Sequence, residues 1–591
     1  MKKINRRNFV KSLVAGVSVP YLASTNTARA NSTSVTDWSA STIASRFENT
    51  TLNTDSSTVF DLSIASGDPT SSGVILWTHI TPSEYSYSEP LFFQVAIDEA
   101  FELLLVEGEI QGHSFGEHSD FTVKVDIDGK LGSNQRYYYR FIYKNTVSKT
   151  GRCKTTPTIG EQPDNLKFGV LTCQDYTNGY YGALNYLAED DSIDFVLHLG
   201  DFIYESVGDP AFQDLPFEDR LITLPSSAKV ALNIEDYRHL YKTYRSDPYL
   251  QKALENHTWI FTTDDHETCN DCYWDYEQDT LGCPDHPYNE EASLDLRRQL
   301  KLDSQRAWAE YIPARIEINP LATHPHDYSK IYRHVQFGDL LNLYMLDTRT
   351  YRTAHPCGEG TIGERYLASG CQNTDNPDQS MLGREQREWL ISNLATSNTR
   401  WNVLGNQTYM GRLGIDFGDK LKIPFNTDAW DGYTAERQLL MNELSANDVN
   451  NFVVLTGDLH SYIASEIKKD YQNIYALDFD NYRGVEFMTP SVTSAGLADA
   501  LSSELADNQL TSALLNSLSE SAIRLSNSHI KMFNSVDNGY STIEFKDSYC
   551  EWIGYKVDKN VNATGQGREA ISRFRKYEAI PWMTRLPTFG Y

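Results

Sequence analysis

Six apolar segments between residues 166 and 458 each end on a side chain that can bind a metal ion. The segments read LKFGVLT, DFVLHLG, HTWIFTT, LLNLYMLD, WNVLGN and NFVVLTGD. The side chains at or just beyond their ends are Cys173, Asp201, the run Asp264-Asp265-His266, Asp347, Asn406, and Asp458 with His460. Near-continuous apolar strands are typical of layered α/β folds, in which ligands gather at the carboxyl ends of strands. One such residue is most simply a turn former or helix cap, but six in succession predict a shared site.

The segments between these strands favour an α/β architecture. SLDLRRQLKLDSQRAWAEYI, residues 293–312, has the character of a helix, and we expect helices to cover both faces of the sheets. Residues 56–156 differ, because short strand-like pieces such as GVILWTHI and RYYYRFIYK alternate with turn formers. This pattern predicts a small antiparallel sandwich, and CKTTPTIGEQPDN then has the composition of a linker.

Composition limits the classes of function. A chain of 591 residues is long enough for two or three domains, and its apolar fraction of 40% can build large cores. The formal net charge of -28 argues against nucleic-acid binding through phosphate neutralisation, so no nucleic acid is expected as a specific partner.

The first thirty residues have the character of an export signal. Basic residues precede an apolar stretch too short to span a bilayer, and a small-x-small sequence ends at Ala30. Arg6 and Arg7 resemble the twin-arginine export signal, which carries already folded proteins. We therefore expect the twin-arginine export machinery as a partner, a periplasmic or extracellular location, and no stable membrane anchor.

Eight cysteines in an exported chain favour disulfides. No second C-x-x-C and no suitably spaced His pair completes a zinc ribbon. We expect a disulfide within one set of five cysteines and leave its pairing open: Cys269, Cys272, Cys283, Cys357 and Cys371.

The side chains at the strand ends form a mixed set of metal ligands. Thiolate and tyrosinate, from Cys173 and Tyr204, favour a ferric or similarly Lewis-acidic ion. Asp and Asn oxygens suit calcium, magnesium or manganese. A carboxylate such as Asp201 can bridge two cations about 3.5–4 Å apart, which is the spacing of two-metal hydrolysis. Such a pair activates a water as hydroxide and neutralises charge on a phosphoryl group during in-line attack.

The motifs GDFIY, DDHE, GNQ and GDLH resemble the dispersed signature of calcineurin-like metallophosphoesterases. More closely, the chain resembles the PhoD-like alkaline phosphatase and phosphodiesterase family. Matching pieces include IASGDPTSSGVILWTHI, LTCQDY, VLHLGDFIYE, LDTRTYR, VLGNQTYM, VVLTGDLHSY and SHIKMFN, in order from about residue 60 to about residue 540. Each piece is weak alone, whereas the ordered set is specific.

The resemblance implies a four-layer α/β/β/α metallophosphoesterase core preceded by a small antiparallel β-sandwich of immunoglobulin or fibronectin type. With the export signal at 1–30, the implied domains are the sandwich at 31–157 and the catalytic domain at 158–591. Two departures from the family bear on substrate range. Thr263 stands where the family usually has Trp, and the segment after DDHE carries three cysteines.

The resemblance also implies a role for each site residue. Ferric iron would be bound by Cys173, Tyr204 and His460, with Asp201 bridging to a second ion. That second ion, calcium or another divalent cation, would be held by Asp265, Asn406 and Asp458. His266 would contact the phosphate and protonate the leaving oxygen.

Simpler interpretations remain open for several of these residues. Cys173 could be a buried thiol or a disulfide partner, and Tyr204 could pack in a core. Asn406 could be a turn amide, with Gln407 as the substitute ligand. We expect Asp347 to organise Arg349, and His198 to be a core imidazole with its hydrogen bonds satisfied.

The predicted activity is metal-dependent hydrolysis of phosphomonoesters, phosphodiesters or both at alkaline pH, for phosphate scavenging. The alternatives are a phospholipase-type phosphodiesterase acting on lipid or cell-wall polymer phosphates, and a non-catalytic surface-binding protein with a degenerate core. Covalent histidine catalysis is disfavoured, because HIKMFNSVD places Asp537 one residue late and has no second copy.

Overall fold

Two sets of three parallel strands form the centre of the protein. This computed structural model describes residues 32–33, 35–42, 47, 51–208, 217–416, 422–473, 478–497, 520–562 and 567–590. The predicted export signal at 1–30 lies outside these residues. The described helices include none with the length and apolar character needed to cross a membrane.

All six apolar segments are strands, as predicted. The first three are parallel neighbours in one sheet: β11 (Asn165–Leu171), β12 (Phe195–His198) and β13 (Thr258–Phe261). The other three are parallel neighbours in a second sheet: β19 (Leu341–Met345), β20 (Trp401–Asn406) and β23 (Phe452–Thr456). The carboxyl ends of each set therefore lie at one edge of its sheet.

Further strands, most of them antiparallel to their neighbours, extend both sheets. The first continues from β11 through β27 (Gly539–Lys546), β28 (Tyr549–Lys556), β29 (Glu569–Tyr577) and β30 (Met583–Arg585). The second adds β18 (Arg333–Phe337) at one end and β25 (Tyr482–Met488), β24 (Tyr462–Lys468) and β26 (Ile530–Asn534) at the other.

The inner faces of the two sheets pack against each other. A continuous buried core joins Phe168 and Leu197 of the first sheet to Val403 and Val485 of the second. The expectation that helices cover both faces of each sheet is therefore wrong. A strand buried between a sheet and a helix layer is as apolar as one buried between two helix layers, so its sequence does not distinguish them.

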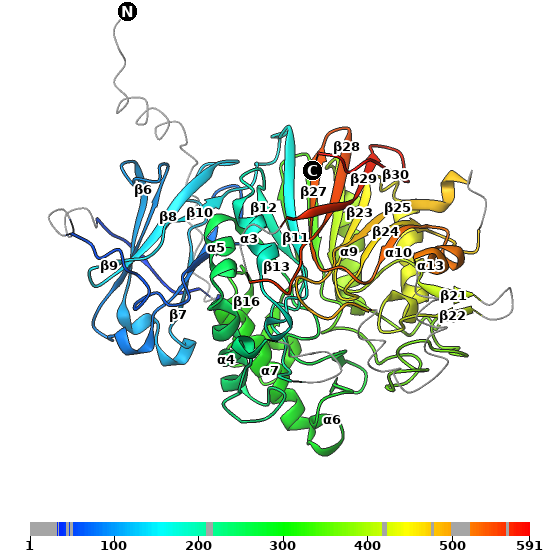
Figure 1. Ribbon diagram of the computed structural model, residues 1–591, viewed down its shortest axis with the longest axis horizontal. Helices are drawn as coiled ribbons and strands as arrows, with labels where there is room; N and C mark the ends of the chain where they lie inside the picture. The colour runs from blue at the N-terminus through cyan, green and yellow to red at the C-terminus, as the bar shows by residue number, and fades with distance from the viewer. Residues whose placement is uncertain are drawn as a thin grey trace, which may run out of the picture.

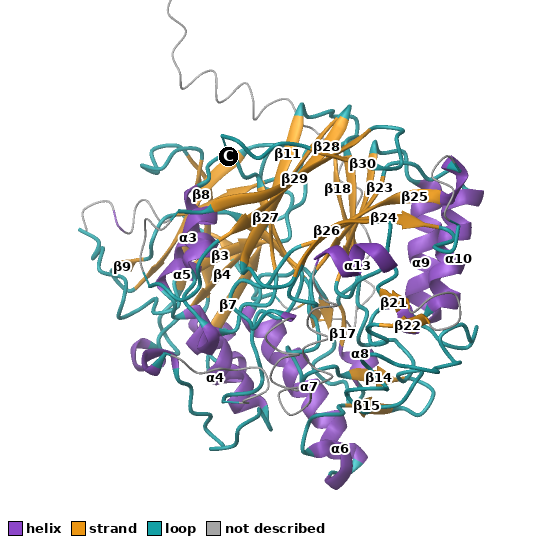
Figure 2. Ribbon diagram, turned by 45° about the vertical axis from the view of Figure 1, so that its right-hand side comes forward, coloured by secondary structure: helices purple, strands orange, loops and turns teal. Residues whose placement is uncertain are grey.

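Helices cover the outer faces and complete the predicted α/β/β/α layers (Figure 2). The first sheet is covered by α3 (Gly182–Glu189), α4 (Ile234–Arg245), α5 (Pro248–Asn256) and α7 (Leu294–Tyr311). The second is covered by α9 (Gly383–Thr396) and α10 (Thr434–Ala446). Local sequence explains where α5 begins. Its first residue is Pro248, and the Asp247 carboxylate accepts the N–H groups of Tyr249 and Leu250.

An antiparallel sandwich precedes this core and shares a sheet with it (Figure 1). One layer contains β10 (Gly151–Lys154), β8 (Arg136–Tyr143), β5 (Leu91–Ala96), β6 (Leu104–Ile110) and β2 (Ser39–Ala40), with β9 (Thr146–Val147) beside β8. The other contains β3 (Ile64–Gly67), β4 (Ile75–His79) and β7 (Thr122–Asp126). Strand β3 pairs in parallel with β13 through Ser66↔Thr258 and Gly67↔Trp259, so the first sheet runs from the core into the sandwich.

Short elements complete the described fold. They are β1 (Ser32–Thr33), β14 (Tyr273–Asp275), β15 (Thr280–Gly282), β16 (Glu317–Ile318), β17 (Ser329–Lys330), β21 (Gly414–Asp416), β22 (Lys422–Pro424), α6 (Tyr288–Glu291), α8 (Pro325–Tyr328) and α13 (Glu520–Ser526). Of the five cysteines predicted to include a disulfide, Cys357 and Cys371 form one.

The shared sheet leaves no room for a side chain at Gly67. A Cβ there would lie 2.2 Å from the Pro313 carbonyl oxygen and 3.0 Å from that of Trp259. We expect Gly67→Ala to reduce the free energy of unfolding by about 1–3 kcal/mol, since backbone must move to admit the methyl group. Thermal unfolding followed by circular dichroism measures this. Gly567→Ala is the control, because its Cβ would meet nothing within 4 Å; equal midpoints for both variants would contradict the prediction.

Candidate metal centre

The loops after the strands place side chains by holding their backbone in a left-handed conformation. Cys173, Asp201, Asp458 and His460 have φ angles of 54°, 56°, 68° and 48°. Non-glycine residues adopt this region at an energetic cost, and such residues cluster at functional sites. Hydrogen bonds between the loops fix the conformation, because Cys173 N–H donates to the Gly200 carbonyl at 3.2 Å.

The first group of predicted ligands comes from both sheets. Cys173, Asp201 and His460 each offer a ligand atom within 4.8 Å of the others, and all are buried or nearly so. The Tyr204 phenol donates to Asp201 Oδ2 at 3.1 Å and lies 3.1 Å from His460 Nε2. The structure thus brings these four side chains together. Cys173 is a free thiol, which excludes a disulfide at this position in the structure.

His460 is oriented through its other ring nitrogen. Its Nδ1 lies 2.6 Å from the Ala495 carbonyl oxygen, which can only accept, so Nδ1 carries a proton. Burial lowers the pKa of His460 to about 4, which keeps the imidazole neutral. The Nε2 lone pair then faces the phenol and Asp201, as in histidines that bind metals.

The second group contains one acid that we did not predict as a ligand. Asp264, Asp265 and Asp458 have carboxylate oxygens within 4.8 Å of one another. Asp264 Oδ1 accepts from Arg349, but its buried Oδ2 has no hydrogen-bond partner among the described residues. An unpaired carboxylate oxygen next to two further carboxylates fits a cation site. Asp264 belongs to the strand-end run that the sequence marks, so its position could have indicated this.

The neighbouring amides have different surroundings. Gln407 is fully engaged: its oxygen accepts from Thr348 at 2.9 Å, and its NH₂ donates to the Leu346 carbonyl at 2.6 Å. Among the described residues, Asn406 Oδ1 accepts a single hydrogen bond, from Trp430 Nε1 at 3.2 Å. Register pairs Asn406 with Thr456, two residues before Asp458. These contacts favour Asn406 over Gln407 as the amide able to bind an ion.

His266 lies between the two groups of ligands, and the carboxylate of Glu205 contacts its ring. Its Nδ1 is 2.7 Å from Glu205 Oε2, and its ring stacks on Tyr204 with centroids 4.0 Å apart. Burial lowers the pKa of His266, but the charges of Glu205, Asp201 and Asp265 outweigh burial and raise it well above its usual value. Glu205 is not among the residues predicted from the sequence, although it directly follows Tyr204. His266 also has a ring nitrogen within 4.8 Å of ligand atoms of Asp201 and Asp265.

Glu267 ties two of the loops together. Its carboxylate accepts backbone N–H groups from Asp201 at 3.0 Å, Phe202 at 2.7 Å and Asp264 at 2.6 Å. The loop after β12 and the loop after β13 therefore have one common anchor. Burial raises the pKa of Glu267 to about 7 even though these donors favour the charged form.

Arg349 is the main buried cation of the centre. Its guanidinium donates to Asp264 at 2.6 Å, to both oxygens of Asp428 at 2.8 and 3.0 Å, and to Asp458 at 2.9 Å. Asp347 Oδ1 accepts the Arg349 N–H at 3.0 Å, which confirms its predicted organising role. His198 is buried as predicted, but its Nε2 has no described hydrogen-bond partner, so the expectation of a fully satisfied imidazole is wrong.

Buried acids outnumber the buried arginines beside them. The arginines are Arg349 and Arg352, and the acids are Asp201, Glu205, Asp264, Asp265, Glu267 and Asp428, with the nearly buried Asp458 beside them. Burial and neighbouring carboxylates raise the pKa of Asp201 and Asp458 well above the usual value. Metal cations would compensate this excess negative charge, and thiolate, phenolate, imidazole and carboxylate donors suit them.

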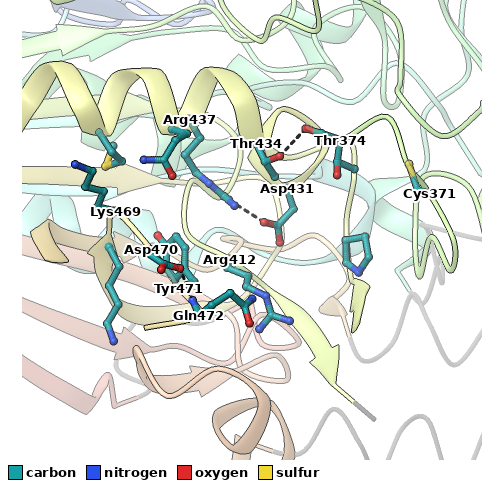
Figure 3. A pocket seen from close by; sticks show the side chains of 14 residues that line it. Cys371, Thr374, Arg412, Asp431, Thr434, Arg437, Lys469, Asp470, Tyr471 and Gln472 are labelled. Carbon is teal, nitrogen blue, oxygen red and sulfur yellow. Dashed lines mark hydrogen bonds and ion pairs between the residues drawn. The ribbon is translucent and has the colours of Figure 1, made fainter. Parts of the chain in front are cut away.

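A separate cavity of about 320 Å³ lies against α10 (Figure 3). Asp431 and Arg437 form an ion pair of 2.8 Å in its wall, with Arg412 and Tyr471 nearby. None of its lining residues is a predicted site residue. The cavity is therefore not the candidate metal centre.

Comparison with known proteins gives consistent findings. Residues 46–157 match the PhoD-like phosphatase N-terminal domain, and residues 168–552 match the PhoD-like phosphatase family. Alkaline phosphatase D of Bacillus subtilis (strain 168) is 33% identical over 447 residues, which cover 75% of this chain and 70% of that protein. A solved structure described as "Structure of PhoD" matches with a TM-score of 0.76 at 28% identity, covering 90% of this chain and 93% of that one.

Loss of the Arg349 guanidinium should destabilise the fold. In Arg349→Met, buried carboxylates lose their compensating charge, and we expect a loss of about 3–5 kcal/mol in the free energy of unfolding. Urea unfolding followed by tryptophan fluorescence measures it. Arg400→Met is the control, since Arg400 is 40% exposed in its ion pairs with Asp547 and Glu578 and should matter by at most about 1 kcal/mol. Similar unfolding midpoints for the two variants would refute the role of Arg349.

Proposed function

This chain belongs to the PhoD-like phosphatase family and is a phosphoesterase, and we propose that it hydrolyses phosphomonoesters and phosphodiesters at alkaline pH at a centre of two cations. The observation that carries this proposal is the convergence of strand-end ligands from two sheets: Cys173 and Asp201 follow strands of the first sheet, and His460 follows a strand of the second. Phosphate scavenging outside the inner membrane is the proposed use.

Each cation would have its own set of ligands. Cys173, Tyr204 and His460 would hold ferric iron, because thiolate and phenolate favour a strongly Lewis-acidic ion. Asp265, Asn406 and Asp458 would hold calcium, or another divalent cation, through oxygen atoms. Asp201 would bridge, since its Oδ2 faces Tyr204 and its Oδ1 accepts the backbone N–H of His266 on the other side. Asp264 Oδ2 offers a further oxygen to the second cation.

When bound, the two cations would lower the pKa of a water molecule and neutralise charge on the phosphoryl group. The protein's own part is to keep the ligands in position and to handle protons. Tyr204 and Cys173 are protonated in the buried site, where burial raises the pKa of both groups, so each gives up its proton on binding an ion. Glu267 and Arg349 keep the ligand loops in register without contacting the reacting atoms.

His266 would act as the general acid. Glu205 holds Nδ1 at 2.7 Å and favours the imidazolium, so Nε2 carries a proton that can pass to the leaving oxygen. The stacked Tyr204 ring fixes the plane of the imidazole. Export by the twin-arginine route belongs to the same proposal, because it allows the protein to fold and to load its metals before it crosses the membrane.

Metal analysis tests the ligand assignment. We expect protein purified without added metal to contain iron and calcium, and to be coloured by charge transfer from phenolate and thiolate to iron. Tyr204→Phe should lose or strongly shift the absorption band. Tyr241→Phe should keep it, since Tyr241 is equally buried but is not one of the proposed ligands. Colourless zinc protein with full activity would refute the assignment.

Leaving-group dependence tests His266. His266→Ala should retain both ions and lose about 10²–10⁴-fold in turnover on alkyl phosphates, which need protonation of the leaving oxygen. The loss should be small on nitrophenyl phosphate, whose leaving group is stable as an anion. Asp265→Ala should instead lose the second ion and fail on every substrate, and His286→Ala provides a buried histidine control. If His266→Ala empties a metal site or slows both substrates equally, His266 is a ligand or an anchor.

A further inference from the structure

Three buried cysteines form a cluster beside the proposed centre. Cys269, Cys272 and Cys283, here called the thiol cluster, have exposed fractions of 2%, 0% and 0%. Each is a free thiol in the structure, whereas Cys357 and Cys371 are joined. They occupy the segment that follows His266, where the sequence departs from the family pattern.

Backbone geometry brings the three thiols together. The Cys272 N–H donates to the Cys269 carbonyl at 3.0 Å, so these two residues close a tight turn. Tyr273 pairs with Gly282 at the open end of the β14–β15 hairpin. Cys272 therefore directly precedes β14, and Cys283 directly follows β15, at this open end. The Cys269 thiol interacts with the thiols of both.

The same turn holds the proposed ligand Asp265. The Asp265 carbonyl oxygen accepts N–H groups of Thr268 at 2.7 Å and Cys269 at 2.8 Å, and Cys272 Sγ lies 3.5 Å from it. Asp265 Oδ2 accepts the Asp271 N–H at 2.6 Å. Any covalent bond within the thiol cluster would thus restrict the backbone that carries Asp265 and His266.

We propose that the thiol cluster is an oxidation site, in which Cys269 forms one disulfide with either Cys272 or Cys283 while the third cysteine stays reduced. In this step two thiols lose two protons and two electrons, and an external disulfide such as oxidised glutathione takes them up and becomes two thiols. The free cysteine can then attack Cys269 Sγ as a thiolate and release the former partner as a thiolate, which exchanges one link for the other. Cys269 is the shared member because its thiol interacts with both others.

The arrangement favours oxidation over metal binding. A thiolate metal site needs its sulfur atoms around one point, as in structural zinc sites. Among the described residues, the groups whose ligand atoms all lie within 4.8 Å of one another do not include this trio. The effect of this disulfide on catalysis rests on the proposed function, whereas the formation of the disulfide does not.

Peptide mapping tests the bond directly. The full-length protein is refolded with a mixture of reduced and oxidised glutathione, since the folded thiols are buried, and then alkylated, digested without reduction and mapped by mass spectrometry. We expect the Cys357–Cys371 link and one further link, from Cys269 to Cys272 or to Cys283. Cys272→Ser should give only the link to Cys283, and Cys283→Ser only the link to Cys272. Three alkylated thiols, a link between Cys272 and Cys283, or stoichiometric zinc held by the cluster would overturn the proposal.

The effect on the site is measured against matched variants. Oxidised Cys269→Ser keeps the Cys357–Cys371 link but has no link in the cluster. Its phosphatase activity should be lost on heating roughly tenfold faster than that of oxidised wild type. Cys550→Ser, which removes a buried cysteine outside the cluster, should behave as wild type. Equal lifetimes for Cys269→Ser and wild type would overturn the bracing role. If no phosphatase activity is found at all, the proposed function fails, while the mapping still decides the disulfide.

Discussion

The buried guanidinium of Arg349 links the parts of the protein that must meet. It follows a strand of the second sheet, yet it donates to Asp264 after a strand of the first sheet and to Asp458 after another strand of the second. Asp428, on the loop before α10, accepts from it through both oxygens. Without this charge, the carboxylates at the two sheet edges would repel one another in a medium of low polarity. Sharing one cation among these carboxylates therefore helps the strand ends to be rich in acids.

Much of the fold and of the site could be predicted, because the relevant signals are local. A buried strand is a run of apolar residues, and the polar residue that ends it stands next to it in the sequence. The neighbouring positions of Cys173 and Asp201 then follow from the rule that parallel strands present their carboxyl ends at one edge, whereas His460 reaches them from the other sheet. The choice between Asn406 and Gln407 could not be made in this way, because it depends on the separate contacts that each amide makes with Trp430 and Thr348.

Contacts between segments that lie far apart in the sequence were not predicted from the residues themselves. The pairing of β3 with β13 joins Gly67 to Trp259 across nearly two hundred residues, and neither strand carries a mark of its partner. The packing of sheet on sheet was expected from family resemblance alone. Glu205 and Asp264 were overlooked for another reason. An acid next to a motif has many ordinary uses, and only the 2.7 Å contact of Glu205 with His266 and the unpaired oxygen of Asp264 distinguish them.

The left-handed backbone at Cys173, Asp201, Asp458 and His460 limits how such a site can change during evolution. Asp, Asn and His enter this conformation more readily than other side chains do, and they are also common ligands of cations. β-Branched residues are nearly excluded from it. A random substitution at these positions therefore tends to do two kinds of damage. It removes a ligand, and it strains the backbone of the loop. Glycine would relax the loop while emptying the site, so selection for greater stability alone would erode the function.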